Sequence, residues 1–387
     1  MNLTPFATGF RPFFLGAAVL AISTMVMWMG VYLLQWPIRF TGISTFHWHA
    51  HEMIFGYAMA VIAGFLLTAA RSWTGQETLS GAGLGWLFAV WVLARLLMLA
   101  GTQLIIYAAI ADIVFMLALI IAVARPIVKV RQKRQAPVLL LLVLLLVTNV
   151  TFYLGAAGLL NQGAQWGVYG GLYLVLGIIL FMGSRVIPFF TKGGVNYPVD
   201  LKSSRWNDIG TFILYPLFAF AEIFFPHHPA GALLAAGLVT LNSIRVSGWH
   251  TLGIWQKPLL WGLFAAFIMI NLGFLLRTMS LVTGISPFLA IHAFAVGGVG
   301  IITISMMARV ALGHTGRDVH QAPPVVTPVL ISMVLATTVR VFLPLFDPAH
   351  YQLWITISAT LWIISYALFA GFFIPILLKP RADGKPG

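Results

Sequence analysis

The chain has 387 residues, of which 60% are hydrophobic and only 8% are charged, and its mean hydropathy of +0.96 excludes an ordinary soluble globular protein. Its formal net charge of +13 is expected to orient the chain at a lipid surface, so we expect membrane lipid and no nucleic acid as a partner. The absence of cysteine excludes disulfides, thiolate metal sites, iron–sulfur clusters and covalently attached c-type haem.

Apolar runs between charged or Pro/Gly-marked breaks predict twelve transmembrane helices, because about 20 apolar residues span the hydrocarbon layer. The predicted spans are 12–36, 46–70, 81–100, 103–124, 136–160, 166–190, 208–226, 229–249, 258–282, 286–312, 324–346 and 351–378. We therefore expect an all-α polytopic membrane protein, in which residues 1–387 form one transmembrane domain and one helix bundle. We expect the first span to be a retained helix, and we find no convincing internal repeat.

Basic residues in the connections predict the orientation, because Lys and Arg gather in cytoplasmic loops. They lie after the fourth span, after the sixth span and in the C-terminal tail: Arg125, Lys129, Arg131, Lys133, Arg134; Lys192, Lys202, Arg205; and Lys379, Arg381, Lys385. The connections at 101–102, 161–165, 283–285 and 347–350 carry no Lys or Arg, and Arg39 is the one exception on that side. The pattern predicts that both termini are cytoplasmic.

This orientation places eight polar residues from five spans near the outer end of the bundle. They are His47, His49, His51 and Glu52 of the second span, His292 of the tenth, and Arg95, Arg277 and Arg340 of the third, ninth and eleventh. Charged groups inside a membrane cost at least ~2.5 kcal/mol each on insertion scales, and they usually face the bundle interior and mark function. We therefore expect these residues to form one outer site.

The four histidines are candidate ligands of copper, iron or zinc, which imidazole suits. His47 and His51 are four residues apart and share a helix face, whereas His49 points away unless the helix start is unwound. Two alternatives stay open: a three-histidine copper site, or a haem between axial histidines of two helices. In the second case Arg95, Arg277 and Arg340 would neutralise the haem propionates. A hydrogen-bonded polar cluster without metal is the third interpretation.

Glu52, Asp112 and Glu222 are candidates for supporting the ligands or for relaying protons. For Asp112 and Glu222, pairing with a neighbouring arginine is the favoured alternative. Asn149 and Tyr153 are expected to form hydrogen bonds between helices.

A second polar group is predicted at the cytoplasmic face. Its members are Arg11, Arg71, Arg185, Arg309, His314 and Arg317. Anchoring at lipid headgroups and capping of helix C-termini explain such residues. The functional alternative is a site for an anion, a haem propionate or an entering proton, with His314 able to titrate near neutral pH.

At four segments the chain resembles the NnrS family of membrane haem and copper proteins, which are associated with nitric oxide metabolism in denitrifying and pathogenic bacteria. The segments are G-F-R-P-F-F at 9–14, W-H-A-H-E-M-I-F-G with A-V-I-A-G-F-L-L-T-A and W-T-G within 48–75, R-V-I-P-F-F-T at 185–191, and H-A-x-x-V-G with M-x-x-R-V-x-L-G-H-T-G-R within 292–317. The resemblance implies b-type haem, copper and the bacterial inner membrane. Its motifs correspond to His49, His51, Glu52, His292, Arg309, His314 and Arg317, with Arg11 and Arg185. One departure is Phe264, in W-G-L-F-A-A-F, where the family has a histidine-containing segment.

These observations lead to three function hypotheses. The first is a haem and copper protein that binds nitric oxide, either reducing it as an oxidoreductase or relieving nitrosative stress; reduction would need an external cytochrome or quinol as electron donor. The second is a secondary transporter of a small solute or metal with a polar His/Arg site, because twelve helices with cytoplasmic termini are common in transporters. The third is a metal sensor or insertion factor without enzymatic activity.

Overall fold

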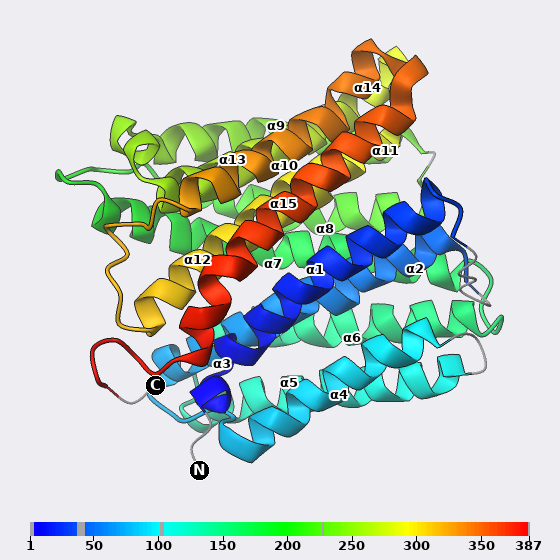
Figure 1. Ribbon diagram of the computed structural model, residues 1–387. Coiled ribbons are helices and arrows are strands. Elements are labelled where there is room, and N and C mark those ends of the chain that lie inside the picture. Colours follow the sequence, from blue (N-terminus) through cyan, green and yellow to red (C-terminus); the bar gives the residue numbers. More distant parts are fainter. Residues whose placement is uncertain (1–3, 37–42, 101–103, 227, 386–387) are drawn as a thin grey trace. The chain divides into compact units, whose positions relative to one another are not determined.

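The computed structural model describes residues 4–36, 43–100, 104–226 and 228–385, and in these ranges the chain forms helices and no strand (Figure 1). Arg39 lies outside the described residues. The long helices are α1 (Phe10–Tyr32), α3 (Met59–Thr74), α4 (Gly81–Leu99), α5 (Ile105–Lys129), α6 (Ala136–Ala156), α7 (Gly163–Gly194), α8 (Arg205–Phe224), α9 (Pro229–Trp249), α10 (Pro258–Thr283), α12 (Ile301–His314), α13 (Val326–Val341) and α15 (Tyr351–Leu378). Short segments complete two of the spans: α2 (Thr45–His51) with the π-helix η2 (Glu52–Ala58), and α11 (Pro287–His292) with the π-helix η6 (Ala293–Gly300).

The helical spans agree with the apolar runs of the sequence, so the predicted all-α polytopic membrane fold is confirmed. Eleven spans among the described residues are long and apolar enough to cross a membrane. The remaining predicted span corresponds to α8, which has the length of a crossing but begins with Arg205, Asn207 and Asp208 and carries Glu222 near its end. These polar residues lower the hydropathy of α8, so it is not counted among the eleven candidate membrane spans.

Two compact units divide the described helices. The first unit contains residues 1–175, 309–317 and 369–387, and the second contains 176–308 and 318–368. The chain passes between the units four times: within α7, α12 and α15, and in the connection after α12. The prediction of a single transmembrane domain stays a prediction.

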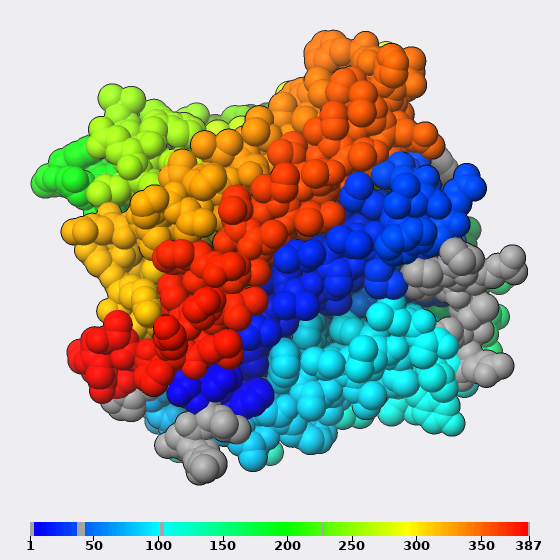
Figure 2. All heavy atoms as spheres, viewed as in Figure 1, coloured from blue at the N-terminus to red at the C-terminus, as the bar shows by residue number. Residues whose placement is uncertain are grey.

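In the first unit, α1 packs against α3 and η2, while α4, α5 and α6 follow one another as neighbours. Figure 2 shows the side chains of α1, in blue, meeting those of α4, in cyan. In the second unit, α8, α9 and α10 pack in sequence order, and α10 also contacts η6 and α13. Ser358 and Ser365 of α15 donate hydrogen bonds to carbonyl groups of α13 and join these two helices.

One span that begins in each unit is interrupted in the same way. A short α-helix ends at a histidine, His51 or His292, and a π-helix of seven or eight residues follows directly. The π-helix forms i→i+5 hydrogen bonds, is rare, appears mostly as a single turn inside an α-helix, and is frequent at functional sites. An α-helix then continues to a Thr-Gly pair whose glycine has a positive φ, +65° at Gly75 and +75° at Gly316.

The two interrupted spans form an internal repeat that the sequence analysis did not find. Gly75 lies 24 residues after His51, and Gly316 lies 24 residues after His292. Without any gap, only five of the 25 aligned positions are identical, which explains why the sequence alone hides the repeat. The surroundings also correspond, because η2 contacts the preceding α1 and the following α4, and η6 contacts the preceding α10 and the following α13.

We predict that Gly316→Ala destabilises the protein more than Gly75→Ala. Both changes force a Cβ into the left-handed region, which costs roughly 1–2 kcal/mol. A Cβ at Gly75 would meet nothing within 4 Å, whereas one at Gly316 would lie 2.6 Å from Cγ of Asp383 in the C-terminal tail. Thermal unfolding of the purified variants in detergent measures the difference, and an equal loss of melting temperature in both would contradict this account of the tail contact.

Candidate functional site

A buried polar cluster lies inside the first unit at the junction of α2 and η2. Its members come from four spans: His51 and Glu52 from the junction, Arg95 from α4, Asp112 from α5, and Asn149 and Tyr153 from α6. All six side chains are buried. Three of them belong to the predicted outer site, and Asn149 and Tyr153 form the interhelical hydrogen bonds that were expected of them.

Arg95 joins the two carboxylates of the cluster. Its Nη1 donates to Oε1 of Glu52 at 2.8 Å, and its Nη2 forms an ion pair with Oδ1 of Asp112. The hydroxyl of Tyr153 donates to the other oxygen of Asp112 at 2.8 Å. The prediction that Asp112 pairs with an arginine is therefore confirmed.

Both ring nitrogens of His51 face oxygen atoms. Nδ1 lies 3.1 Å from Oε1 of Glu52, and Nε2 lies 3.0 Å from Oδ1 of Asn149. The amide nitrogen of Asn149 points to Sδ of Met116 at 3.3 Å, which leaves its oxygen for the histidine. Since carboxylate and amide oxygens accept hydrogen bonds, this geometry favours an imidazolium that donates from both nitrogens.

A protonated His51 makes the cluster electrically neutral. His51 and Arg95 then balance Glu52 and Asp112, which is favourable where no water can solvate an excess charge. The ring also stacks on Phe152, with centroids 4.2 Å apart and an interplanar angle of 28°. In this arrangement neither nitrogen of His51 presents a lone pair to a metal.

His47 and His49 lie at the start of the same span but outside the cluster. Ser44 caps α2, and its Oγ lies 3.1 Å from Nδ1 of the half-buried His47. The ring of His49 stacks on Trp28 of α1, with centroids 4.5 Å apart and an interplanar angle of 20°. His51 alone therefore reaches the buried carboxylates.

In the second unit, His292 contacts Arg340 at the position that corresponds to the first cluster. Its Nδ1 lies 2.6 Å from the carbonyl oxygen of Phe288, and its Nε2 lies 3.1 Å from Nη2 of Arg340. Arginine nitrogens only donate, so Nε2 accepts and the proton resides on Nδ1. Arg340 also donates to the hydroxyl of Tyr351 at 3.0 Å. Sequence reasoning did not single out Tyr351, whose only signal is its position at the start of the last span.

Arg277 and Glu222 form a separate buried ion pair in the second unit, as the pairing alternative predicted. Nε of Arg277 donates to Oε1 of Glu222 at 2.8 Å, and Nη1 and Nη2 donate to Ser280 and to the carbonyl of Pro226. Gly231 of α9 makes room for the pair, because a Cβ there would lie 1.9 Å from the carboxylate. In this geometry the guanidinium of Arg277 is paired with the carboxylate of Glu222.

Several residues of the predicted cytoplasmic group cap helix ends. Within the first unit, the buried Arg11 donates to the carbonyl groups of Leu377 and Lys379 at the C-terminus of α15, each at 2.7 Å. Arg317 donates to Thr315, and Arg381 donates to the carbonyl of His314. These contacts support the capping interpretation, which the dipole of a helix favours.

The remaining members of that group have other surroundings. Arg71 pairs with Glu77 on the surface at 2.8 Å, and the half-buried Arg309 lies on α12. The ring of His314 lies beside Phe10, and the guanidinium of Arg185, in the second unit, lies 4.0 Å from the ring centroid of Phe181. An anion or proton site at this face stays a prediction.

Phe264, the departure from the family pattern, is buried in α10. Its ring lies against Trp255 and against His250, with the centroid of His250 5.7 Å away. Nε2 of His250 accepts a hydrogen bond from the indole of Trp255 at 3.1 Å. A histidine is therefore present beside this position, although Phe264 itself cannot bind a metal.

Single histidines of this protein can bind a metal or haem iron, but the candidate ligands do not come together into a complete ligand set. Within the described ranges, no group of three or more His, Asp and Glu side chains is arranged to hold a metal ion. His292 has the tautomer of a ligand, with Nδ1–H on a backbone carbonyl and Nε2 as an acceptor that Arg340 contacts in this structure. His51 and His292 belong to different units, so their joining in one site stays a prediction.

We predict that Arg95→Leu strongly destabilises the protein, because it leaves two carboxylates and one imidazolium buried with a net negative charge. Breaking a buried ion pair on one side costs about 3–5 kcal/mol. The double change Arg95→Leu with Asp112→Asn should recover part of the loss, since it restores neutrality. Thermal unfolding in detergent measures both variants, with the exposed Arg125→Leu on α5 as control. A double variant no more stable than Arg95→Leu would contradict the charge balance.

Comparison with known proteins gives one match over nearly the whole chain. The family model described as NnrS protein matches residues 4–381. No curated protein matches the chain.

Proposed function

Because this chain belongs to the NnrS family, we propose that it is a haem b- and copper-binding protein of the bacterial inner membrane. Family membership supports a role in nitric oxide metabolism or in the response to nitric oxide. The eleven apolar spans make it a multi-pass membrane protein.

The geometry of His292 is the observation that carries the ligand assignment. A neutral imidazole that donates Nδ1–H to a carbonyl is held in one orientation, and this contact is typical of histidines that bind metals through Nε2. Imidazole is a common ligand of haem iron and copper. His292 is therefore the first candidate ligand, followed by His47 and His49, whose rings lie outside the closed cluster of His51.

Arg340 occupies the acceptor nitrogen of His292 in this structure. If Nε2 binds a metal, this contact is released and the guanidinium becomes available for a carboxylate. Haem carries two propionates, and arginine binds carboxylates in a bidentate manner. Tyr351 keeps Arg340 close to the histidine in either case.

The cluster around His51 has a supporting role in this proposal. Its tyrosine, histidine and carboxylates are joined through Arg95 into one set of polar contacts that can hold a proton inside the membrane. Bound haem iron would supply the chemistry, namely the binding of nitric oxide. Whether nitric oxide is reduced depends on electrons from an external cytochrome or quinol.

We predict that His292→Ala lowers the haem or copper content of the purified protein several-fold, because it removes the candidate ligand. Pyridine haemochrome assay and metal analysis measure the content. His320→Ala is the matched control, since His320 is exposed in the connection before α13. Unchanged content in a folded His292→Ala protein would rule out this ligand.

We further predict that the reduced protein has b-type haem absorption bands that change when nitric oxide is added. Consumption of nitric oxide in the presence of a reductant then separates an enzyme from a protein that only binds. The secondary transporter is the alternative, and the internal repeat favours it, because many transporters are built from repeats. A featureless spectrum together with solute flux into proteoliposomes would establish that alternative instead.

A further inference from the structure

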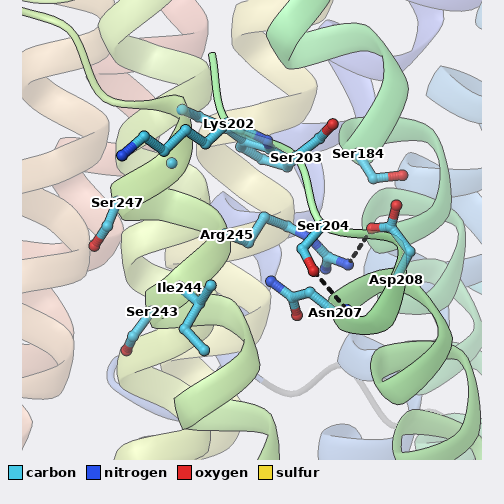
Figure 3. Close-up of a pocket in the computed structure, with 12 residues that line it drawn as sticks. Ser184, Lys202, Ser203, Ser204, Asn207, Asp208, Ser243, Ile244, Arg245 and Ser247 are labelled. Carbon is cyan, nitrogen blue, oxygen red and sulfur yellow. Dashed lines mark hydrogen bonds and ion pairs between the residues drawn. The ribbon is translucent and has the colours of Figure 1, made fainter.

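The second unit contains an open cavity, lined by many polar residues, that the proposed function does not use. Its volume is about 630 Å³, and it lies among the end of α7, the connection 195–204, the start of α8 and the end of α9 (Figure 3). Five serines line it: Ser184, Ser203, Ser204, Ser243 and Ser247. A serine hydroxyl both donates and accepts, so such a lining suits a ligand that is rich in oxygen.

Local contacts hold the walls of the cavity together. The amide of Lys202 donates to the carbonyl of Gly248 at 2.9 Å and ties the connection to α9. Ser204 caps α8 by accepting from the amide of Asn207. Figure 3 shows the side chains of Ser204, Asn207 and Arg245 turned toward one another.

Two cations and one acid determine the charge of the cavity. Arg245 is 5% exposed, and its Nη2 donates to Asp208 at 2.9 Å while Nη1 donates to Asn242 at 3.3 Å. Lys202 is exposed and adds a second positive charge. Because Asp208 is the one acid in the lining, the cavity carries a net positive charge and favours an anion.

Asn207 provides an independent sign of a ligand. Its side chain is 6% exposed and lines the cavity, and its amide nitrogen donates to the carbonyl of Leu241 at 2.9 Å. Its Oδ1 has no hydrogen-bond partner among the described residues. Burying such an acceptor unpaired costs roughly 1–3 kcal/mol. A hydroxyl group on a ligand would satisfy it.

The cavity lies where headgroups of the cytoplasmic leaflet are expected. Its connection is one of the basic loops that predict the cytoplasmic side. Trp206, next to Asn207, is 82% exposed, and Phe189 of α7 is 71% exposed, as is typical of aromatic residues at the membrane surface. The cytoplasmic leaflet carries anionic lipids that attract Lys and Arg.

We propose that this cavity binds a phosphate ester, with Lys202 and Arg245 facing the phosphate and the serines and Asn207 facing hydroxyl groups. The headgroup of an anionic glycerophospholipid has both features and lies at the right surface. A free phosphate in the cytoplasm shares the first feature, so the two sources are separated by experiment.

Thermal stabilisation of the full-length protein in detergent tests the proposal. The probes are short-chain phosphatidylglycerol, short-chain phosphatidylcholine and inorganic phosphate, and the midpoint of stabilisation is measured for each. We expect phosphatidylglycerol to stabilise the protein at lower concentration than phosphatidylcholine. Stabilisation by inorganic phosphate at a similar concentration would instead identify a free phosphate as the ligand.

Variants of the two exposed charges give opposite expected changes. Lys202→Gln should raise the phosphatidylglycerol concentration at half-maximal stabilisation about fivefold, because one surface cation near anionic lipid is removed. Asp208→Asn should lower this concentration, because the carboxylate that competes with the phosphate for Arg245 is removed. Lys129→Gln, at the C-terminal end of α5 in the first unit, is the matched control. The proposal is overturned if neither anionic probe stabilises the protein, if phosphatidylcholine acts equally well, or if both variants behave like the control.

Discussion

Buried charge has to be balanced inside a bundle whose surroundings are hydrocarbon, and the first unit does this with four ionisable side chains. Arg95 joins Glu52 and Asp112, while His51 lies between one of these carboxylates and Asn149. The cost of an uncompensated charge makes four spans converge on one point. The second unit applies the same principle in the pair of Arg277 with Glu222, whereas Arg340 donates a hydrogen bond to the neutral ring of His292.

The sequence predicted the fold well because hydropathy reports directly on membrane crossings. All twelve predicted spans correspond to helical segments, including α8, whose polar start lowers its hydropathy. It also predicted that Asp112 and Glu222 pair with arginines, since a lone acid in a membrane needs a partner. The π-helices and the repeat were not predictable, because a one-residue change in helical period leaves no clear apolar pattern. The contact of Asn149 with His51, and that of Tyr351 with Arg340 beside His292, could be recognised only from the three-dimensional structure.

The contrast between the two histidines bears on where a cofactor binds. They occupy equivalent positions in the repeat, yet His51 is held between two acceptors and His292 between one acceptor and one donor. A donor such as arginine selects the neutral ring, whereas two acceptors select the charged ring. Equivalent positions thus have different hydrogen-bond partners, which suits one for metal binding and the other for the buried charge cluster.

A π-helix is an α-helix into which one additional residue has been accommodated. Each such residue rotates everything before it by roughly 100° about the helix axis, because an α-helix has 3.6 residues per turn. In both interrupted spans the histidine lies immediately before this rotation. The azimuth of each imidazole therefore depends on the number of residues in the π-helix that follows it. Deleting one residue from either π-helix would turn the preceding histidine by the same angle about the helix axis, without changing any other residue.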